Sequence, residues 1–166
     1  MATFNLAIEP LLDIEKGFND IPNDRGGPTN FGISLKWCRQ AINPSATTDD
    51  IRNLTRARAI EMYRERFWKF DAINSQEVAN KIFEMAVHAS GATPFIVQKS
   101  LNYVSKAGLL VDGIFGPKTV MAINNCASEA LLKELRARAA FRYAEIVFHD
   151  PTQMSFMLGW CRRAVS

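Results

Sequence analysis

Residues 17–34 limit the possible folds of this chain more than any other segment. Four glycines and two prolines fall within these eighteen positions, with Asn and Asp residues between them, and this composition excludes a helix. Two short runs inside the segment, 18–21 and 30–34, suit the strands of a small hairpin. The sequence therefore predicts a minor β element near the N-terminus.

The rest of the sequence has the pattern of helices. Apolar residues recur at helical spacing through 128–149, the longest segment of this kind, and further helices are predicted over about 48–67 and 75–89. Pro following a residue suited to a helix cap marks other helix starts, at Thr93–Pro94, Gly116–Pro117 and Asp150–Pro151. A helix before Gly17 must accommodate Pro10, so it either starts near Glu9 or kinks there. The predicted class is mainly α (α+β).

Composition limits the class of protein further. The 166 residues are 48% hydrophobic with a net charge of +3, as in one globular domain or two small ones that share a core. So small a charge disfavours nucleic-acid binding, although it suits a mildly anionic polymer. No basic leader opens the sequence and no apolar run could span a membrane, which predicts a protein made in the cytoplasm without a signal peptide or membrane segment.

Metal and cofactor chemistry find no support in the sequence. The two histidines, His88 and His149, have no Cys or carboxylate at ligand spacing. The three cysteines are far apart and are predicted to be reduced, without a catalytic role. The sequence predicts neither a metal site nor a cofactor.

Two carboxylates stand on either side of a predicted helix-to-loop transition. Glu15 falls beside the apolar stripe in the last turn of its helix, where the helix dipole and apolar surroundings both raise the pKa of a carboxyl. Asp24 follows in the glycine-rich loop, and Thr29 comes five residues later. An acid facing a second carboxylate, with a hydroxyl to hold water, suits glycoside hydrolysis. The alternative is that Glu15 is a solvated helix charge and Asp24 a turn residue.

A family resemblance bears on this choice. The run Glu15–Ser34 resembles the E-G-G-Y…D-x-G-G-x-T-x-x-G-I signature of the glycoside hydrolase family 108 N-acetylmuramidases, found among phage endolysins and secretion-activating proteins. The resemblance implies that Glu15 is the catalytic acid and, by analogy with phage-type lysozymes, that Asp24 and Thr29 position the hydrolytic water. Two positions depart from the pattern, since Lys16 stands where Gly is usual and Phe18 where Tyr is frequent.

Later segments resemble the predicted peptidoglycan-binding domain that follows the catalytic part in this family. They are 67–68, 86–91, 111–119 and 159–163. Trp68, His88 and Asp112 are accordingly candidate substrate-binding residues. Each also has a purely structural interpretation: Trp68 at helical spacing fills the core, His88 is a satisfied core histidine, and Asp112 belongs to a tight turn.

The resemblance implies a lysozyme-like fold with a catalytic part over 1–91 and a wall-binding part over 92–166, packed as one unit. It implies cleavage of the β-1,4 bond between N-acetylmuramic acid and N-acetylglucosamine, without a cofactor. Two alternatives remain open, namely a lytic transglycosylase on the same bond and a non-catalytic peptidoglycan-binding or secretion-assisting protein. The expected partner is peptidoglycan, reached in the periplasm through a holin or a secretion system.

Overall fold

The computed structural model describes residues 1–14, 17–20, 27–89 and 91–165. They form a mainly helical protein with one small antiparallel sheet, which confirms the predicted fold class. The chain divides into two compact units. The smaller is Phe4–Trp68, and the larger combines Met1–Thr3 with Lys69–Ser166.

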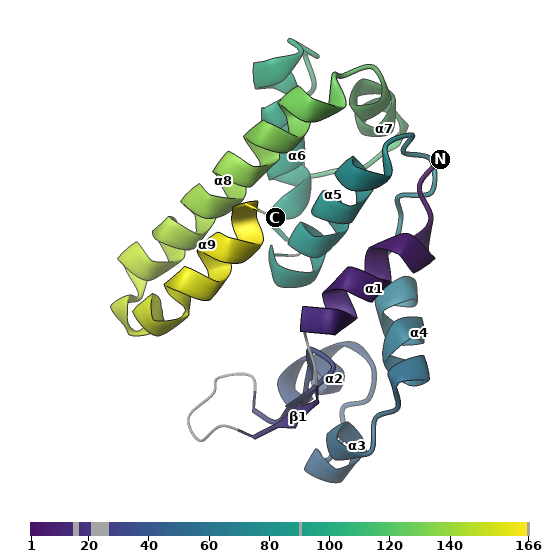
Figure 1. Cartoon of the computed structure of the whole chain (residues 1–166), viewed down its shortest axis with the longest axis vertical. Coiled ribbons are helices and arrows are strands. Elements are labelled where there is room, and N and C mark those ends of the chain that lie inside the picture. Colours follow the sequence, from purple (N-terminus) through teal and green to yellow (C-terminus); the bar gives the residue numbers. More distant parts are fainter. Residues whose placement is uncertain (15–16, 21–26, 90, 166) are drawn as a thin grey trace. The chain divides into compact units, whose positions relative to one another are not determined.

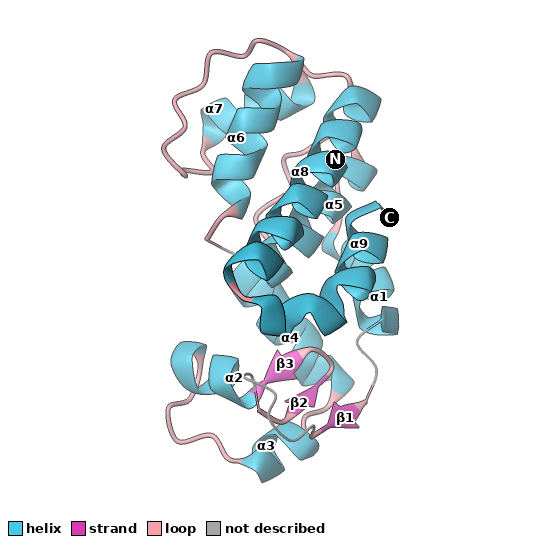
Figure 2. Cartoon of the chain, turned by 90° about the vertical axis from the view of Figure 1, so that its left-hand side faces the viewer, coloured by secondary structure: helices cyan, strands magenta, loops and turns pink. Residues whose placement is uncertain are grey.

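Over its described residues, the smaller unit contains four helices and a three-stranded sheet, whose strands follow the first helix in the sequence (Figures 1 and 2). Its elements are α1 (Phe4–Ile14), β1 (Phe18–Asn19), β2 (Thr29–Asn30), β3 (Ile33–Ser34), α2 (Leu35–Ala41), α3 (Thr48–Arg52) and α4 (Arg56–Phe67). The strands lie in the order β1-β2-β3, so β2 is central. Helix α2 contacts β3 and helix α3 contacts β2, so both helices pack against the sheet.

Helix α1 passes through Pro10. Proline has no N–H for the carbonyl of Leu6, but Leu6 and Pro10 are both exposed, so water can take the place of the missing bond. The opposite face of the helix buries Phe4, Ala7, Ile8, Leu11 and Leu12. This burial stabilises the turn before the proline, and the helix therefore begins at Phe4 and not near Glu9.

Strands β2 and β3 form a hairpin whose turn is Phe31–Gly32. Both residues have positive φ, 50° and 76°, as a type I′ hairpin turn requires. The unusual conformation of Phe31 is supported by the Tyr63 hydroxyl, which donates to the Phe31 carbonyl at 3.0 Å. The predicted runs 18–21 and 30–34 do pair, through Phe18 opposite Asn30, although Ile21 lies outside the described residues. The second run also reverses at Gly32, so that it contributes to both β2 and β3.

Asn30 joins the central strand to helix α3. Its buried side-chain amide donates to the carbonyls of Ile51, Arg52 and Leu54 at 3.0, 3.2 and 3.4 Å. These carbonyls lie where the chain leaves α3, and Thr55 then caps α4 by accepting from the Arg58 N–H. The single helix predicted over 48–67 is thus two helices, because Asn30 and Thr55 satisfy the backbone groups that the break exposes.

Replacing Asn30 with Ala is expected to lower the free energy of unfolding by about 2–3 kcal/mol, since three carbonyls lose their donor in a buried setting. Urea unfolding followed by circular dichroism measures the loss. Asn53→Ala, at an exposed position in the same break, is the control and should change stability by less than about 0.5 kcal/mol. Equal losses in the two variants would show that Asn30 does not anchor α3.

The larger unit is built around one long helix, α8 (Figure 1). Its elements are α5 (Gln76–Ala89), α6 (Thr93–Val104), α7 (Pro117–Asn124), α8 (Ser128–His149), the 3₁₀ helix η1 (Pro151–Phe156) and α9 (Met157–Val165). Helix α8 contacts α5, α6, α7, η1 and α9, and it has the predicted bounds. The helix starts predicted at Pro94, Pro117 and Pro151 are confirmed to within one residue, although the last opens a 3₁₀ helix.

Two further predictions concern the three cysteines and the absence of a membrane-spanning helix. Cys38 and Cys126 are buried, Cys161 is partly buried, and all three are free thiols. Over the described ranges, each helix is either too short or too polar to span a bilayer.

Candidate functional site

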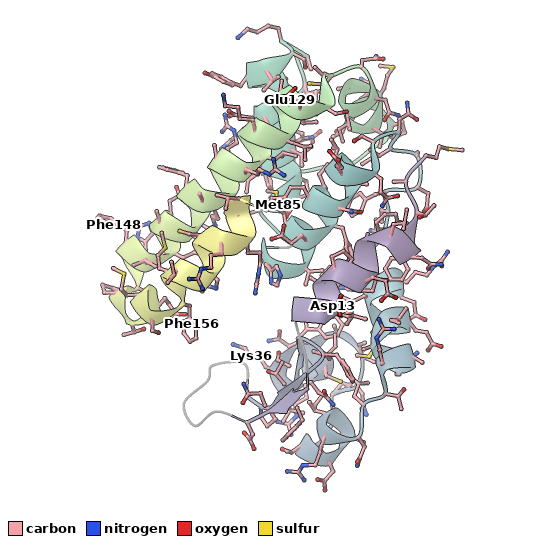
Figure 3. All side chains as sticks on the ribbon, viewed as in Figure 1. Asp13, Lys36, Met85, Glu129, Phe148 and Phe156 are labelled. Carbon is pink, nitrogen blue, oxygen red and sulfur yellow. The ribbon has the colours of Figure 1, made fainter. Side chains whose placement is uncertain are left out.

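Two of the predicted catalytic residues, Glu15 and Asp24, lie outside the described residues. The elements before and after Glu15 are described: α1 ends at Ile14, immediately before Glu15 in the sequence, and β1 begins at Phe18. Figure 3 labels Asp13 at the C-terminal end of α1. The structure therefore defines the elements on both sides of the predicted acid.

Helix α1 is held firmly against α4. The Phe4 ring packs edge-on against Trp68, with 5.6 Å between ring centroids, and the Arg64 guanidinium lies 5.5 Å from the Phe4 centroid. Glu9 and Arg56 form an exposed ion pair between the same helices. Trp68 is only 7% exposed, so it is a core residue here, and its substrate-binding role stays a prediction.

Thr29 lies in the central strand, opposite Asn19 of β1 and Ser34 of β3. Its hydroxyl donates to the Gly27 carbonyl at 3.1 Å. A hydroxyl oxygen still accepts hydrogen bonds while it donates one, so Thr29 keeps the capacity to bind a water. The pairing of Thr29 with Asn19 also ties it to the strand that follows Glu15 in the sequence.

Contacts with the neighbouring helices hold the strands around Thr29 in place. The Leu35 N–H donates to the Pro28 carbonyl at 2.8 Å, and the Arg52 guanidinium lies 4.9 Å from the centroid of the Phe18 ring. Asn30 and Tyr63 add the contacts described above. These contacts fix the position of Thr29 in the sheet, as the ordering of a water by its hydroxyl requires.

His88 belongs to a cluster of ionisable groups in the larger unit. The Arg163 guanidinium lies 3.0 Å from both ring nitrogens of His88. The Lys81 ammonium donates to the Glu84 carboxylate at 2.8 Å and to the Arg163 carbonyl at 2.7 Å. Burial above all, with the charges of Arg163 and Lys81, lowers the pKa of His88 to about 3. The ring is therefore neutral and accepts from Arg163, and its substrate-binding role stays a prediction.

Asp112 lies in an irregular loop, residues 105–116, between α6 and α7. Its exposed carboxylate accepts from the Gln98 amide at 2.7 Å and from the Ile114 N–H at 2.8 Å, and these two bonds hold its pKa below the ordinary value. The side-chain amide oxygen of Gln98 in turn accepts from the Gly113 N–H at 2.9 Å. Asp112 thus fixes the turn, as its structural interpretation requires, and its carboxylate still faces solvent.

Sequence reasoning missed the two amides that hold this loop. Gln98 is 2% exposed, and Asn102, one helical turn later, exchanges two 2.7 Å hydrogen bonds with the backbone of Leu109. Both face the loop because positions four apart share one side of a helix. Two amides at this spacing before a Gly-containing loop were the available signal.

Gly113 takes up a conformation in which an added side chain meets Phe95. Its φ is +76°, and a Cβ there would lie 2.4 Å from the Phe95 ring. Gly113→Ala is expected to cost about 2 kcal/mol of stability, against about 1 kcal/mol for Gly108→Ala, where φ is +64° and no atom lies within 4 Å. Thermal unfolding measures both. The difference should disappear in a Phe95→Ala background, and its persistence there would refute the clash with Phe95.

Comparison with known families now adds to this geometry. The sequence model described as glycosyl hydrolase 108 matches residues 8–90, which is half of the chain. The chain belongs to this family. A second model, described as a predicted peptidoglycan domain, matches residues 94–165. This chain is accordingly a glycoside hydrolase that has peptidoglycan as its partner. Its mainly helical fold is lysozyme-like.

A solved structure is similar to this chain over nearly its whole length. This structure is that of Brucella abortus SagA, with 27% identity, a TM-score of 0.72, and coverage of 98% of this chain and 93% of that one. No curated protein matches. The family models divide between residues 90 and 94, whereas the compact units divide between Trp68 and Lys69, so the domain boundary at residue 91 stays a prediction.

Proposed function

We propose that this protein is an N-acetylmuramidase that hydrolyses the β-1,4 bond between N-acetylmuramic acid and N-acetylglucosamine in peptidoglycan. The observation that carries the proposal is the family match over residues 8–90, because this range includes the whole Glu15–Ser34 run. The peptidoglycan domain match over 94–165 supports the choice of polymer.

In this proposal Glu15 protonates the glycosidic oxygen as the bond breaks, and Asp24 and Thr29 orient the attacking water. A general acid must be protonated near neutral pH, and the negative end of the α1 dipole, at Ile14 directly before Glu15 in the sequence, favours that form. Support for Thr29 comes from its fixed position in β2 and its free accepting capacity. Asp112 contributes to binding the wall polymer from the loop 105–116.

Analysis of the products tests the proposed reaction. Purified peptidoglycan is digested with the protein, the fragments are reduced with borohydride, and mass spectrometry identifies the ends. Reduced N-acetylmuramic acid ends are expected for a muramidase. Anhydro ends would replace the proposal with a lytic transglycosylase, reduced N-acetylglucosamine ends would move the cut to the other bond, and a lack of products would favour the non-catalytic wall-binding or secretion-assisting function.

The proposed substrate also sets the place of action. Peptidoglycan lies outside the cytoplasmic membrane, so the proposed enzyme acts in the periplasm, after release by a holin or a dedicated secretion system. Lysis by the protein supplied in the cytoplasm should then depend on co-expression of such a partner.

A further inference from the structure

A groove of about 940 Å³ lies in the larger unit, bounded by the end of α6, the loop 105–116 and α7. We call it the loop groove. Its apolar lining includes Leu110, Ile114 and Met121, which are 77%, 66% and 62% exposed. Large aliphatic side chains left this open to solvent in a preformed groove provide a surface that a ligand can cover.

The shape of the loop groove is set before any ligand binds. The loop has twelve residues between α6 and α7 and contains neither helix nor strand, yet the amides of Gln98 and Asn102 hold it by the five hydrogen bonds that join them to Leu109, Asp112, Gly113 and Ile114. Long irregular loops in compact domains usually serve a function. A loop already ordered in this way loses little conformational entropy on binding.

The lining indicates the chemistry of the ligand. Among the described residues, the loop groove has no aromatic side chain on which a sugar ring could stack. It offers aliphatic side chains together with one carboxylate, Asp112, and one ammonium, Lys118. The charge of Lys118 helps to lower the pKa of Asp112, but the two side chains form no direct ion pair in the part of the chain that the structure describes, so each can also meet a ligand. This combination fits a short peptide with small apolar residues and charges of both signs.

We propose that the loop groove binds the peptide stem of peptidoglycan and not its glycan strand. The inference rests on the proposed function for its choice of polymer, and it names which part of that polymer the larger unit recognises. The stem carries a free amino group on its diamino acid and carboxylates beside it. Asp112 binds the amino group, Lys118 binds a carboxylate, and the aliphatic residues cover the alanine side chains.

Titration of the full-length protein with the tripeptide L-Ala-γ-D-Glu-meso-diaminopimelate, followed by NMR of the backbone amides, tests this site. Saturable shifts are expected at residues 105–122. A parallel titration uses glycan strands from which an amidase has removed the peptides. Shifts in the loop groove with stripped glycan but none with tripeptide would overturn the proposal, as would tripeptide shifts confined to other residues.

Variants with matched controls sharpen the test. Asp112→Asn keeps the oxygen that accepts from Gln98 and Ile114 but removes the charge, and Leu110→Gln changes an exposed side chain. Each should weaken tripeptide binding about fivefold. Lys118→Gln should have a similar effect, whereas Lys133→Gln and Phe148→Gln, exposed positions on α8, should have none. Phe148 projects from the outer side of α8 in Figure 3.

The outcome separates this inference from the proposed function. Equal affinities in the groove variants and the α8 controls would refute the groove as the site. Thermal unfolding of each variant shows that a loss of binding is not a loss of folding. If the protein binds the tripeptide in the groove but leaves peptidoglycan uncut, the proposed muramidase activity is wrong and the peptide site stands.

Discussion

Glu15→Gln is expected to lower the rate of peptidoglycan cleavage by about a thousandfold, with little change in stability. If Glu15 is the general acid, the amide cannot supply the proton that the leaving oxygen needs, and general acid catalysis contributes factors of about 10²–10⁴. The initial rate of release of soluble fragments from labelled peptidoglycan gives kcat/KM, and urea unfolding gives the stability of the same samples. A loss in kcat with wall binding retained would separate catalysis from binding.

Glu9→Gln is the matched control for this experiment. Glu9 lies in α1, six positions before Glu15 in the sequence, and carries the same side chain, and its exposed ion pair with Arg56 contributes little to stability. Its activity should stay within about twofold of the unsubstituted protein. A Glu15→Gln protein that retained a tenth or more of the activity would exclude Glu15 as the acid.

The second large effect is on the pH dependence of stability. His88 has a pKa of about 3 in the folded protein, against about 6.5 for an ordinary histidine. Between these values the unfolded chain binds a proton that the folded protein does not, so stability falls as the pH falls from about 6.5 to 3. The shift corresponds to a loss of roughly 4 kcal/mol over this range, and the stability is fully present above pH 6.5.

Other charges near His88 make a variant necessary for this measurement. Lys81 of α5 and Arg163 of α9 act on His88 itself. Glu84 interacts with both of these and with Arg136 of α8, and Tyr143 of α8 interacts with Glu84 and Arg163. Burial raises the pKa of Glu84, which gives a pH dependence of the opposite sign, because the folded protein then binds the extra proton. The contribution of His88 is therefore the difference between the unsubstituted protein and His88→Gln, whose amide can still accept from Arg163.

Urea unfolding at pH 7, 5 and 4 measures that difference. The curve for His88→Gln should decline less steeply toward low pH than the curve for the unsubstituted protein. His149→Gln, the same change at an exposed position, is the control. Parallel curves for His88→Gln and the unsubstituted protein would mean that His88 is protonated in the folded state, contrary to the expectation.

Regular elements were predictable where a local pattern decides them. The bounds of α8 follow from apolar spacing, and α5 begins one residue after the predicted start at 75, where the Ser75 hydroxyl accepts from the Val78 N–H. The break between α3 and α4 was not predictable in the same way, since it depends on Asn30, which lies more than twenty residues earlier in the sequence. A side chain that satisfies distant carbonyls leaves no periodic signal near the break.

The same distinction between local pattern and distant contacts applies to the candidate site. The run Glu15–Ser34 carries its chemistry in residue types and spacing, and the family match includes it. The burial of Trp68, by contrast, depends on Phe4 at the other end of the smaller unit. The neutral state of His88 depends first on its burial and then on the charge of Arg163, 75 residues away. The roles of these side chains are decided by partners that the local sequence does not name.

By itself, then, the sequence determined the helical class, the family and the candidate acid, because these depend on periodicity, composition and a contiguous motif. Only the tertiary structure decided that Gln98 and Asn102 hold an irregular loop open as a groove beside Asp112. The physical reason is that hydrogen bonding and desolvation depend on which groups lie within a few ångströms of each other, and folding sets those distances between residues that are far apart in the chain.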